Sequence, residues 1–140
     1  MRFCFFEQCP RERIVVFGVH ILGVLDHPDL APLFGPDSRA EVPVTGVVAG
    51  SVIGGLVDRL AVLPERVLIA DYKTNRAPPA SLARVPVLYL RQMAAYRAVL
   101  QVIFPGRPVT CALVWTEGAR VMTLPESLLD RHAPCASIPA

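Results

Sequence analysis

The alternation of apolar and polar positions predicts β-strands in the middle of the chain. Residues 40–45 alternate around Pro43, which restricts this segment to the edge of a sheet because proline cannot donate a ladder hydrogen bond. Residues 51–62 alternate again, and residues 67–73 follow them after a short turn that contains Pro64. These two segments predict a β-hairpin, with an edge strand before it in the chain.

Both arms of this hairpin carry charge among apolar residues. In the second arm, the apolar face that begins at Val67 ends in Asp71 and Lys73, because alternate side chains of a strand share a face. In the first arm, we expect Asp58 on the face that also carries Leu56. The two aspartates can therefore face one spot.

Two carboxylates that converge among apolar residues favour a bound cation. Burying them is costly unless something neutralises them, and Mg²⁺ suits the purpose because it prefers oxygen ligands. A nearby lysine can orient or deprotonate an attacking water and stabilise charge that builds on a phosphate, as in metal-assisted phosphodiester hydrolysis. The alternative is a structural ion pair without metal, in which Asp58 pairs with Arg59 or Lys73.

Residues 89–104 predict the best-defined helix of the chain. Its apolar stripe recurs at three-and-four spacing and comprises Tyr89, Gln92, Met93, Tyr96, Leu100 and Ile103. The opposite face comprises Arg91, Ala94, Arg97 and Gln101. Gln92 lies one turn before Tyr96 in the stripe, so we expect both polar groups to point toward the sheet, where a glutamine needs a hydrogen-bond partner.

The remaining segments complete an α/β pattern. Residues 29–34 predict a short helical turn, residues 109–116 a buried strand, residues 121–124 a strand that pairs back with it, and residues 126–131 a short helix. Residues 14–25 are apolar apart from one histidine and fit a buried helix or a buried strand. The chain therefore predicts a mixed central sheet flanked by helices.

Composition places this pattern in one domain or in a fragment of a larger one. The chain has 140 residues, of which 53% are hydrophobic and 19% charged, and this excludes a disordered chain. The net charge of +2 is compatible with a nucleic-acid partner but does not require one. The apolar run of twelve residues, 14–25, is too short to cross a bilayer, so we expect no membrane association.

The cysteines indicate neither a metal cluster nor a disulfide framework. Cys4, Cys9, Cys111 and Cys135 include no C-x-x-C pair, so we expect no zinc ribbon and no iron–sulfur cluster. Nothing marks secretion, and we expect a reducing cytoplasm as the compartment.

Three segments, 54–60, 71–76 and 89–97, resemble in this order the nuclease domain of the AddA and RecB family. Members of this family are bacterial helicase-nucleases that process double-strand DNA breaks, and their nuclease domains belong to the PD-(D/E)xK superfamily. The similarity is greatest to AddA and extends over roughly residues 22–131. It includes the blocks at 30–35, 40–43 and 111–116.

The resemblance implies a restriction-endonuclease-like fold and a role for each matching residue. Asp58 and Asp71 would bind Mg²⁺, or Mn²⁺ in its place, and the main-chain carbonyl of Tyr72 would add a ligand. Lys73 would serve the attacking water and the scissile phosphate, while Gln92 and Tyr96 would form the family's Q-x-x-x-Y element. The DNA phosphates would be contacted by Arg59, Asn75 and Arg76. Glu41 is a weaker candidate, for an outer-shell or structural group, and Trp115 is expected in the core.

Two departures from the family pattern concern the N-terminal part and the motor. Family members carry a metal-binding histidine on a helix well upstream, but His20 precedes Glu41 by only twenty-one positions and is a poor match; His27 and His132 are expected on the surface. The chain also has no phosphate-binding G-x-x-x-x-G-K-S/T loop, so we expect no ATP site and no helicase motor. We therefore expect a C-terminal piece with incomplete N-terminal helices: an atypical segment at 1–21, a nuclease-like domain at 22–132 and a tail at 133–140.

Two functions follow from these observations. The first is a Mg²⁺-dependent, exonuclease-like DNA nuclease that cleaves single strands delivered by a helicase partner, in a parent complex with an AddB-like subunit. The second is a catalytically inactive remnant that serves as a DNA-binding or protein-interaction module.

Overall fold

The computed structural model describes residues 27–75, 77–118 and 120–135. The predictions for residues 1–26, including a helix or strand at 14–25 and the role of His20, lie outside the described residues. Arg76 also lies outside them. No helix in the part of the chain that the structure describes combines the length and apolarity needed to span a bilayer.

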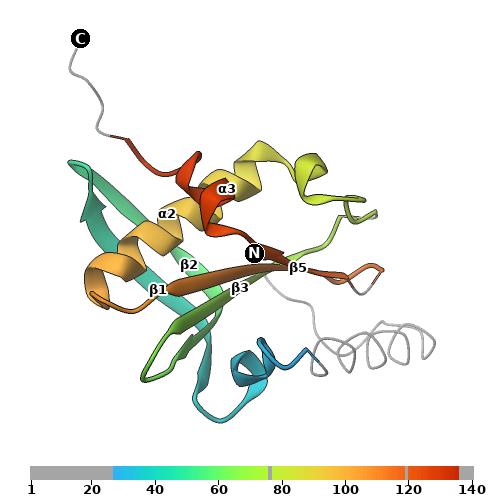
Figure 1. The fold of residues 1–140 in the computed structure, drawn as a ribbon, viewed down its shortest axis with the longest axis horizontal. Helices are drawn as coiled ribbons and strands as arrows, with labels where there is room; N and C mark the ends of the chain where they lie inside the picture. The colour runs from blue at the N-terminus through green and yellow to red at the C-terminus, as the bar shows by residue number, and fades with distance from the viewer. Residues whose placement is uncertain (1–26, 76, 119, 136–140) are drawn as a thin grey trace, which may run out of the picture.

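Five strands form one mixed sheet in the order β1-β2-β3-β4-β5 (Figure 1). The strands are β1 Ser38–Val48, β2 Ser51–Val62, β3 Val67–Lys73, β4 Val109–Trp115 and β5 Arg120–Leu124. Neighbouring strands are antiparallel except for β3 and β4, which are parallel. The predicted hairpin and the predicted edge strand are confirmed, and so is the α/β class with a mixed central sheet.

The parallel step from β3 to β4 places a helix on the sheet, since parallel neighbours need a long crossover. This crossover contains the 3-10 turn η2 Leu82–Arg84 and the helix α2 Val87–Ile103. Helix α3, Glu126–Asp130, lies on the same side of the sheet as α2, whereas the 3-10 turn η1, Ala31–Phe34, lies on the other side (Figure 1). The sheet is therefore covered on both faces around β3.

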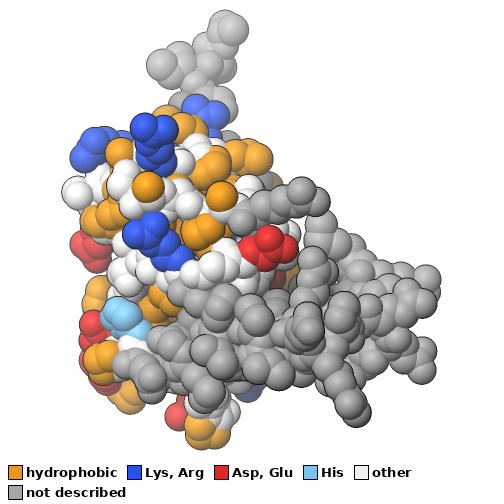
Figure 2. Space-filling view, turned by 90° about the vertical axis from the view of Figure 1, so that its right-hand side faces the viewer, with side chains coloured by type: hydrophobic (Ala, Val, Ile, Leu, Met, Phe, Trp, Pro, Cys, Tyr) orange, Lys and Arg blue, Asp and Glu red, His pale blue; other side chains and the backbone are white. Residues whose placement is uncertain are grey.

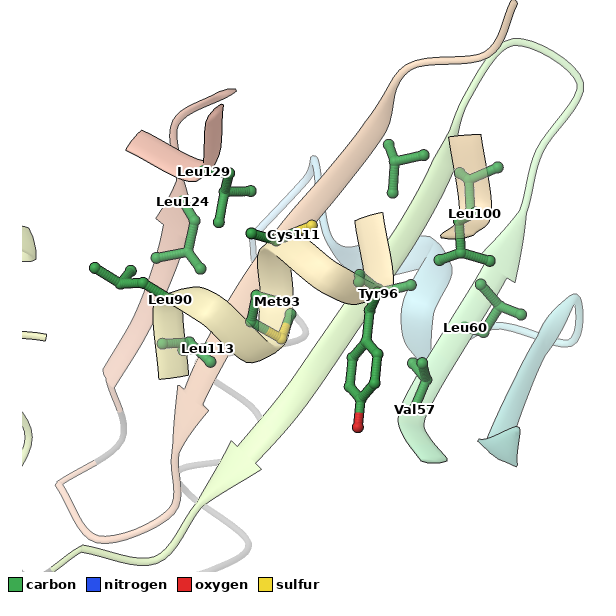
Figure 3. Close-up of a cluster of buried hydrophobic side chains, with 14 of the residues drawn as sticks. Val57, Leu60, Leu90, Met93, Tyr96, Leu100, Cys111, Leu113, Leu124 and Leu129 are labelled. Carbon is green, nitrogen blue, oxygen red and sulfur yellow. The ribbon is translucent and has the colours of Figure 1, made fainter. Parts of the chain in front are cut away.

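The apolar core consists of two clusters separated by the sheet. The larger cluster joins α2 and α3 to one face and contains the side chains labelled in Figure 3, among them Val57, Leu60, Met93 and Tyr96. The smaller one joins η1 to the other face through Leu33 and Leu68. Strand β3 is buried along nearly its whole length, as expected for a central strand covered on both faces.

The predicted solvent face of α2 is wrong in part. Ala94 and Arg97 are buried, while Ile103, expected in the apolar stripe, is exposed. The reason is that α3 packs on this side of α2, so a second face of the helix is covered. Arg97 forms ion pairs there with Asp130 at 2.7 Å and Glu126 at 3.9 Å.

Candidate active site

The hairpin of β2 and β3 separates before β3 ends, and this separation creates the site. The ladder runs from the pair Val62 and Val67 to the pair Arg59 and Ala70 and goes no further. One residue beyond, the Oδ2 atom of Asp58 accepts a hydrogen bond of 2.8 Å from the main-chain N–H of Tyr72. The Asp58 carboxylate thus replaces a ladder hydrogen bond and lies between the two strands beside Asp71.

The strict alternation predicted for β2 is broken near Asp58. Val57 and Leu60 both pack in the cluster under α2, although three positions separate them, and Leu56 is 48% exposed. The face of β2 that packs under α2 therefore changes from odd-numbered to even-numbered residues between Val57 and Leu60, at the level where Asp58 and Glu41 are left out of the ladder between β1 and β2. On β1, Glu41 lies at the same level with a φ of 51°, which is uncommon for a residue with a side chain.

Asp71 is a buried carboxylate with only 5% of its surface exposed. Its Oδ2 atom lies 2.5 Å from the Nζ atom of Lys73. Burial raises the pKa of Asp71 above its ordinary value of 3.8, the Lys73 ammonium opposes this rise, and the neighbouring Asp58 carboxylate adds to it. Asp58 accepts the N–H of Tyr72, the residue that follows Asp71, so the two carboxylates lie close to each other where the hairpin separates.

Lys73 is held by three side chains. Besides the ion pair with Asp71, its ammonium donates a hydrogen bond of 2.9 Å to the Oε1 atom of Gln92. Its Nζ atom also lies 4.0 Å from the ring centroid of Tyr89, a distance typical of a cation–π contact. The partner expected for the glutamine in the apolar stripe is therefore Lys73, on the strand beneath the helix, and Gln92 itself is half-buried.

Tyr96 completes the polar chain that begins at Asp71. The Nε2 atom of Gln92 donates a hydrogen bond of 3.2 Å to the Tyr96 hydroxyl. In Figure 3 the Tyr96 ring extends from α2 past Val57, with its hydroxyl directed away from the other labelled side chains. The ring lies against the backbone of Gly55, where a Cβ atom would come within 2.6 Å of the Tyr96 hydroxyl. The glycine on β2 thus makes room for the tyrosine on α2.

Sequence reasoning placed Tyr89 in the apolar stripe of the helix but gave it no role. Its ring faces the Lys73 ammonium, and its hydroxyl donates a hydrogen bond of 2.9 Å to the Oδ1 atom of Asn75 in the loop after β3. The spacing of Tyr89 in the sequence could have indicated this role. Tyr89 precedes Gln92 by three positions on a helix, and residues three apart lie on the same face. Tyr89 therefore belongs to the site beside Gln92.

The candidate DNA contacts occupy different places. The Nε atom of Arg59 donates a hydrogen bond of 3.0 Å to the Leu33 carbonyl, and its guanidinium lies over the Phe34 ring, so this arginine is held toward η1 on the far face of the sheet. Asn75 is exposed beside Lys73, where contact with a phosphate is possible. Glu41 and His27 are exposed, whereas His132 is half-buried. On the face drawn in Figure 2, Lys and Arg side chains are interspersed with hydrophobic ones.

The donor set suits a hard divalent cation. Asp58 and Asp71 bring carboxylate oxygens together, and Tyr72, whose carbonyl was predicted as a further ligand, follows Asp71 directly. Within residues 27–75, 77–118 and 120–135, no group of three or more His, Cys, Asp or Glu side chains could hold a metal ion. Two carboxylates are sufficient for Mg²⁺, because this ion usually keeps several waters and takes further ligands from substrate phosphates.

Comparison with solved structures supports the fold at low sequence identity. A protein from Eubacterium rectale, provisionally named an exonuclease, aligns with a TM-score of 0.54 and 15% identity over 82% of this chain and 46% of its own. This chain therefore spans about half the length of that structure.

Two further structures align less well. SSO0001 gives a TM-score of 0.42 at 15% identity, over 85% of this chain and 54% of its own. Protein VC1899 from Vibrio cholerae gives 0.37 at 16% identity, over 77% of this chain and 24% of its own. Scores below 0.5 do not establish a shared fold. No family model matches the sequence, and no curated protein matches it.

Proposed function

We propose that this chain is a Mg²⁺-dependent DNA nuclease domain of the PD-(D/E)xK type, related to the nuclease domain of AddA. One observation carries the proposal: the Lys73 ammonium is held between the Asp71 carboxylate and the Gln92 amide, beside Asp58, where β2 and β3 separate. The fold similarity to a structure provisionally named an exonuclease supports it.

Asp58 and Asp71, with the Tyr72 carbonyl, would hold the metal ion. A bound Mg²⁺ supplies charge that polarises a phosphoryl oxygen and lowers the pKa of water. Two roles of Asp58 are compatible here, because one of its oxygens accepts the Tyr72 N–H while the carboxylate keeps further lone pairs for a cation.

Lys73 would act on the phosphate and on the attacking water. Its ammonium lies at the end of β3, fixed by Asp71, Gln92 and Tyr89, so it is oriented before any substrate arrives. A preorganised positive charge stabilises negative charge that develops on a phosphate without further reorganisation. Tyr96 holds Gln92, and Gln92 in turn holds Lys73, so this pair positions the cation.

The substrate, the partners and the cellular process in this proposal follow from the resemblance to AddA. The substrate would be single-stranded DNA produced by a helicase motor and an AddB-like subunit in the bacterial cytoplasm, as part of double-strand-break repair. The sequence contains no phosphate-binding loop for ATP, so the motor in this proposal would be supplied by other sequence.

A binding module without catalytic activity is the second candidate. It is favoured by the ion pair between Asp71 and Lys73, which neutralises Asp71 without metal, and by the small number of metal-binding side chains within the described ranges. Such a module would bind DNA weakly and with strong salt dependence, without turnover and without need of metal.

Calorimetric titration with Mg²⁺ and Mn²⁺ separates these two functions. The nuclease proposal predicts one binding event that is lost in Asp71→Asn and retained in Asp29→Asn, a matched change at an exposed aspartate in the turn before η1. Absence of metal binding by the unmodified chain, or equal binding by both variants, would support the binding module instead.

A further inference from the structure

The side chains of Arg59 and Tyr72 lie side by side on the face of the sheet opposite α2, and neither has a part in the proposed chemistry. Arg59 forms the last pair of the β2–β3 ladder with Ala70, and Tyr72 follows Ala70 two positions later on β3. Ala70 and Tyr72 both pack in the smaller cluster under η1, so Arg59, paired with Ala70, shares their face. Diagonal neighbours on adjacent strands lie about 7–8 Å apart, within reach of long side chains.

The Arg59 side chain is held in place by η1. Its Nε atom donates a hydrogen bond of 3.0 Å to the Leu33 carbonyl, and its guanidinium carbon lies 5.6 Å from the centroid of the Phe34 ring. These contacts leave the two terminal nitrogens of the guanidinium for another partner. The ion pairs among the described residues are made by Lys73 and Arg97, so Arg59 has no carboxylate partner in that part of the chain.

The Tyr72 hydroxyl adds a second donor. The main-chain N–H of Tyr72 is bonded to Asp58, but its hydroxyl has no hydrogen-bond partner among residues 27–75, 77–118 and 120–135. Burial raises the pKa of Tyr72 above its ordinary value of 10.0, the Arg59 guanidinium opposes this rise, and the Asp58 carboxylate adds to it. The hydroxyl therefore keeps its proton at neutral pH and can donate a hydrogen bond to an anion. Arg59 and Tyr72 are each half-buried, so their polar ends can meet a ligand from solvent.

A guanidinium and a hydroxyl on one face suit a phosphate group. Arginine binds phosphate through two parallel N–H donors, and a guanidinium already fixed against a ring loses little freedom when it does so. Tyrosine hydroxyls also donate to the phosphates of nucleic acids. The pair lies beside Asp58 where β2 and β3 separate, whereas Lys73 lies under α2 on the opposite face. A phosphate bound by Arg59 and Tyr72 would therefore be a neighbour of the scissile phosphate.

From these observations we infer that Arg59 and Tyr72 form a binding site for a backbone phosphate of single-stranded DNA, on the face of the sheet that η1 covers. The strand would then run from Lys73 past the separation of β2 and β3 toward η1. The inference rests on the proposed nuclease function for the identity of the strand. Its test, however, needs neither metal nor cleavage.

Fluorescence anisotropy of a labelled oligothymidylate, titrated with the full chain in a chelator at several salt concentrations, tests this site. Arg59→Met removes one charged phosphate contact, so the dissociation constant should rise at least about fivefold, and the slope of log affinity against log salt should become shallower by about 0.7. Tyr72→Phe removes an uncharged donor, so the dissociation constant should rise about two- to tenfold with the salt slope unchanged. Arg59→Lys keeps the charge but loses the paired donors, so it should keep the slope and weaken binding at least about twofold.

Arg66→Met is the matched control. Arg66 lies at the opposite end of the β2–β3 hairpin and also donates to a backbone carbonyl, that of Asp29 at 3.5 Å, so this variant should keep the affinity and the salt slope of the unmodified chain. No binding by the unmodified chain, equal salt slopes in Arg59→Met and Arg66→Met, or unchanged affinity in Tyr72→Phe would overturn the phosphate site. Absence of cleavage together with the expected binding results would instead count against the nuclease function alone.

Discussion

Gly55 shows how a single missing side chain positions the site. A Cβ atom there would come within 2.6 Å of the Tyr96 hydroxyl, whereas a Cβ atom at Gly54 would meet the Thr45 hydroxyl at 3.6 Å, an ordinary contact. Because Tyr96 holds Gln92 and Gln92 holds Lys73, displacement of the tyrosine ring reaches the ammonium through two hydrogen bonds.

We therefore predict that Gly55→Ala lowers the cleavage rate at least tenfold, since a displacement of about 1 Å near reacting groups can cost 100-fold in rate. It should also lower the melting temperature, as overpacking costs about 1–3 kcal/mol. Gly54→Ala is the control, and both should be measured by initial rates and thermal melts. Equal cleavage rates and equal melting temperatures of Gly55→Ala and Gly54→Ala would show that Tyr96 can shift without loss of function.

Tyr89 is predicted to position Lys73 through its ring and the loop through its hydroxyl. Tyr89→Leu removes the cation–π contact, worth about 0.5–2 kcal/mol, so kcat should fall about two- to thirtyfold with little change in KM. Tyr89→Phe keeps the ring and should keep kcat.

An NMR measurement separates this role from a structural one. Protons of the Lys73 side chain next to the ammonium should show an aromatic ring-current shift in the unmodified chain and in Tyr89→Phe, and should lose it in Tyr89→Leu. If the shift is the same in Tyr89→Leu, the ring does not hold Lys73 in solution.

At the scale of elements, the separation of β2 from β3 is the feature that sequence periodicity missed. Alternation correctly predicted the strands and the hairpin, because each segment buries one face. It could not locate Asp58, because a break in alternation between Val57 and Leu60 moves every later side chain to the other face. The second covered face of α2 was missed for a similar reason, since Arg97 is buried only through the later helix α3.

The dual role of Asp58 gives a prediction at this scale. Asp58→Asn keeps an oxygen that can accept the Tyr72 N–H, so the free energy of unfolding should change little while metal affinity falls. Asp58→Ala leaves this N–H without its acceptor and should cost about 1 kcal/mol or more of stability. Chemical denaturation and metal calorimetry of both variants check this, and equal loss of stability in the two would contradict the strand-capping role.

The burial of Asp71 within β3 predicts a pH dependence. Its pKa is raised by burial, so the unfolded chain releases this proton at a lower pH than the folded chain does. The contribution of Asp71 to stability is full below its ordinary pKa of 3.8 and is lost as pH rises through the folded-state pKa. Because Mg²⁺ binds the ionised carboxylate, the rise in melting temperature caused by Mg²⁺ should grow over the same interval. If the rise in melting temperature caused by Mg²⁺ does not depend on pH, or if it has the same pH dependence in Asp71→Asn, the metal binds at another place.

At the scale of the whole molecule, the site is assembled from segments far apart in the sequence. The hairpin brings Asp58 to Asp71, and the crossover helix brings Gln92, Tyr96 and Tyr89 onto the end of β3. Matching motifs could predict which residues meet, and the polar side chain in an apolar stripe indicated that Gln92 faces the sheet.

Cleavage of a single-stranded oligonucleotide tests the central claim most directly. The full chain should cleave it with Mg²⁺ and not with a chelator, and Lys73→Met and Asp71→Asn should each lower the rate at least about 100-fold, as expected for loss of a group that stabilises or positions charge in the transition state. Arg131→Met and Asp29→Asn are matched controls at exposed positions and should cleave normally, with circular dichroism showing that all variants are folded. No cleavage by the unmodified chain, or cleavage unchanged in folded Lys73→Met, would contradict the assignment of this site as a nuclease.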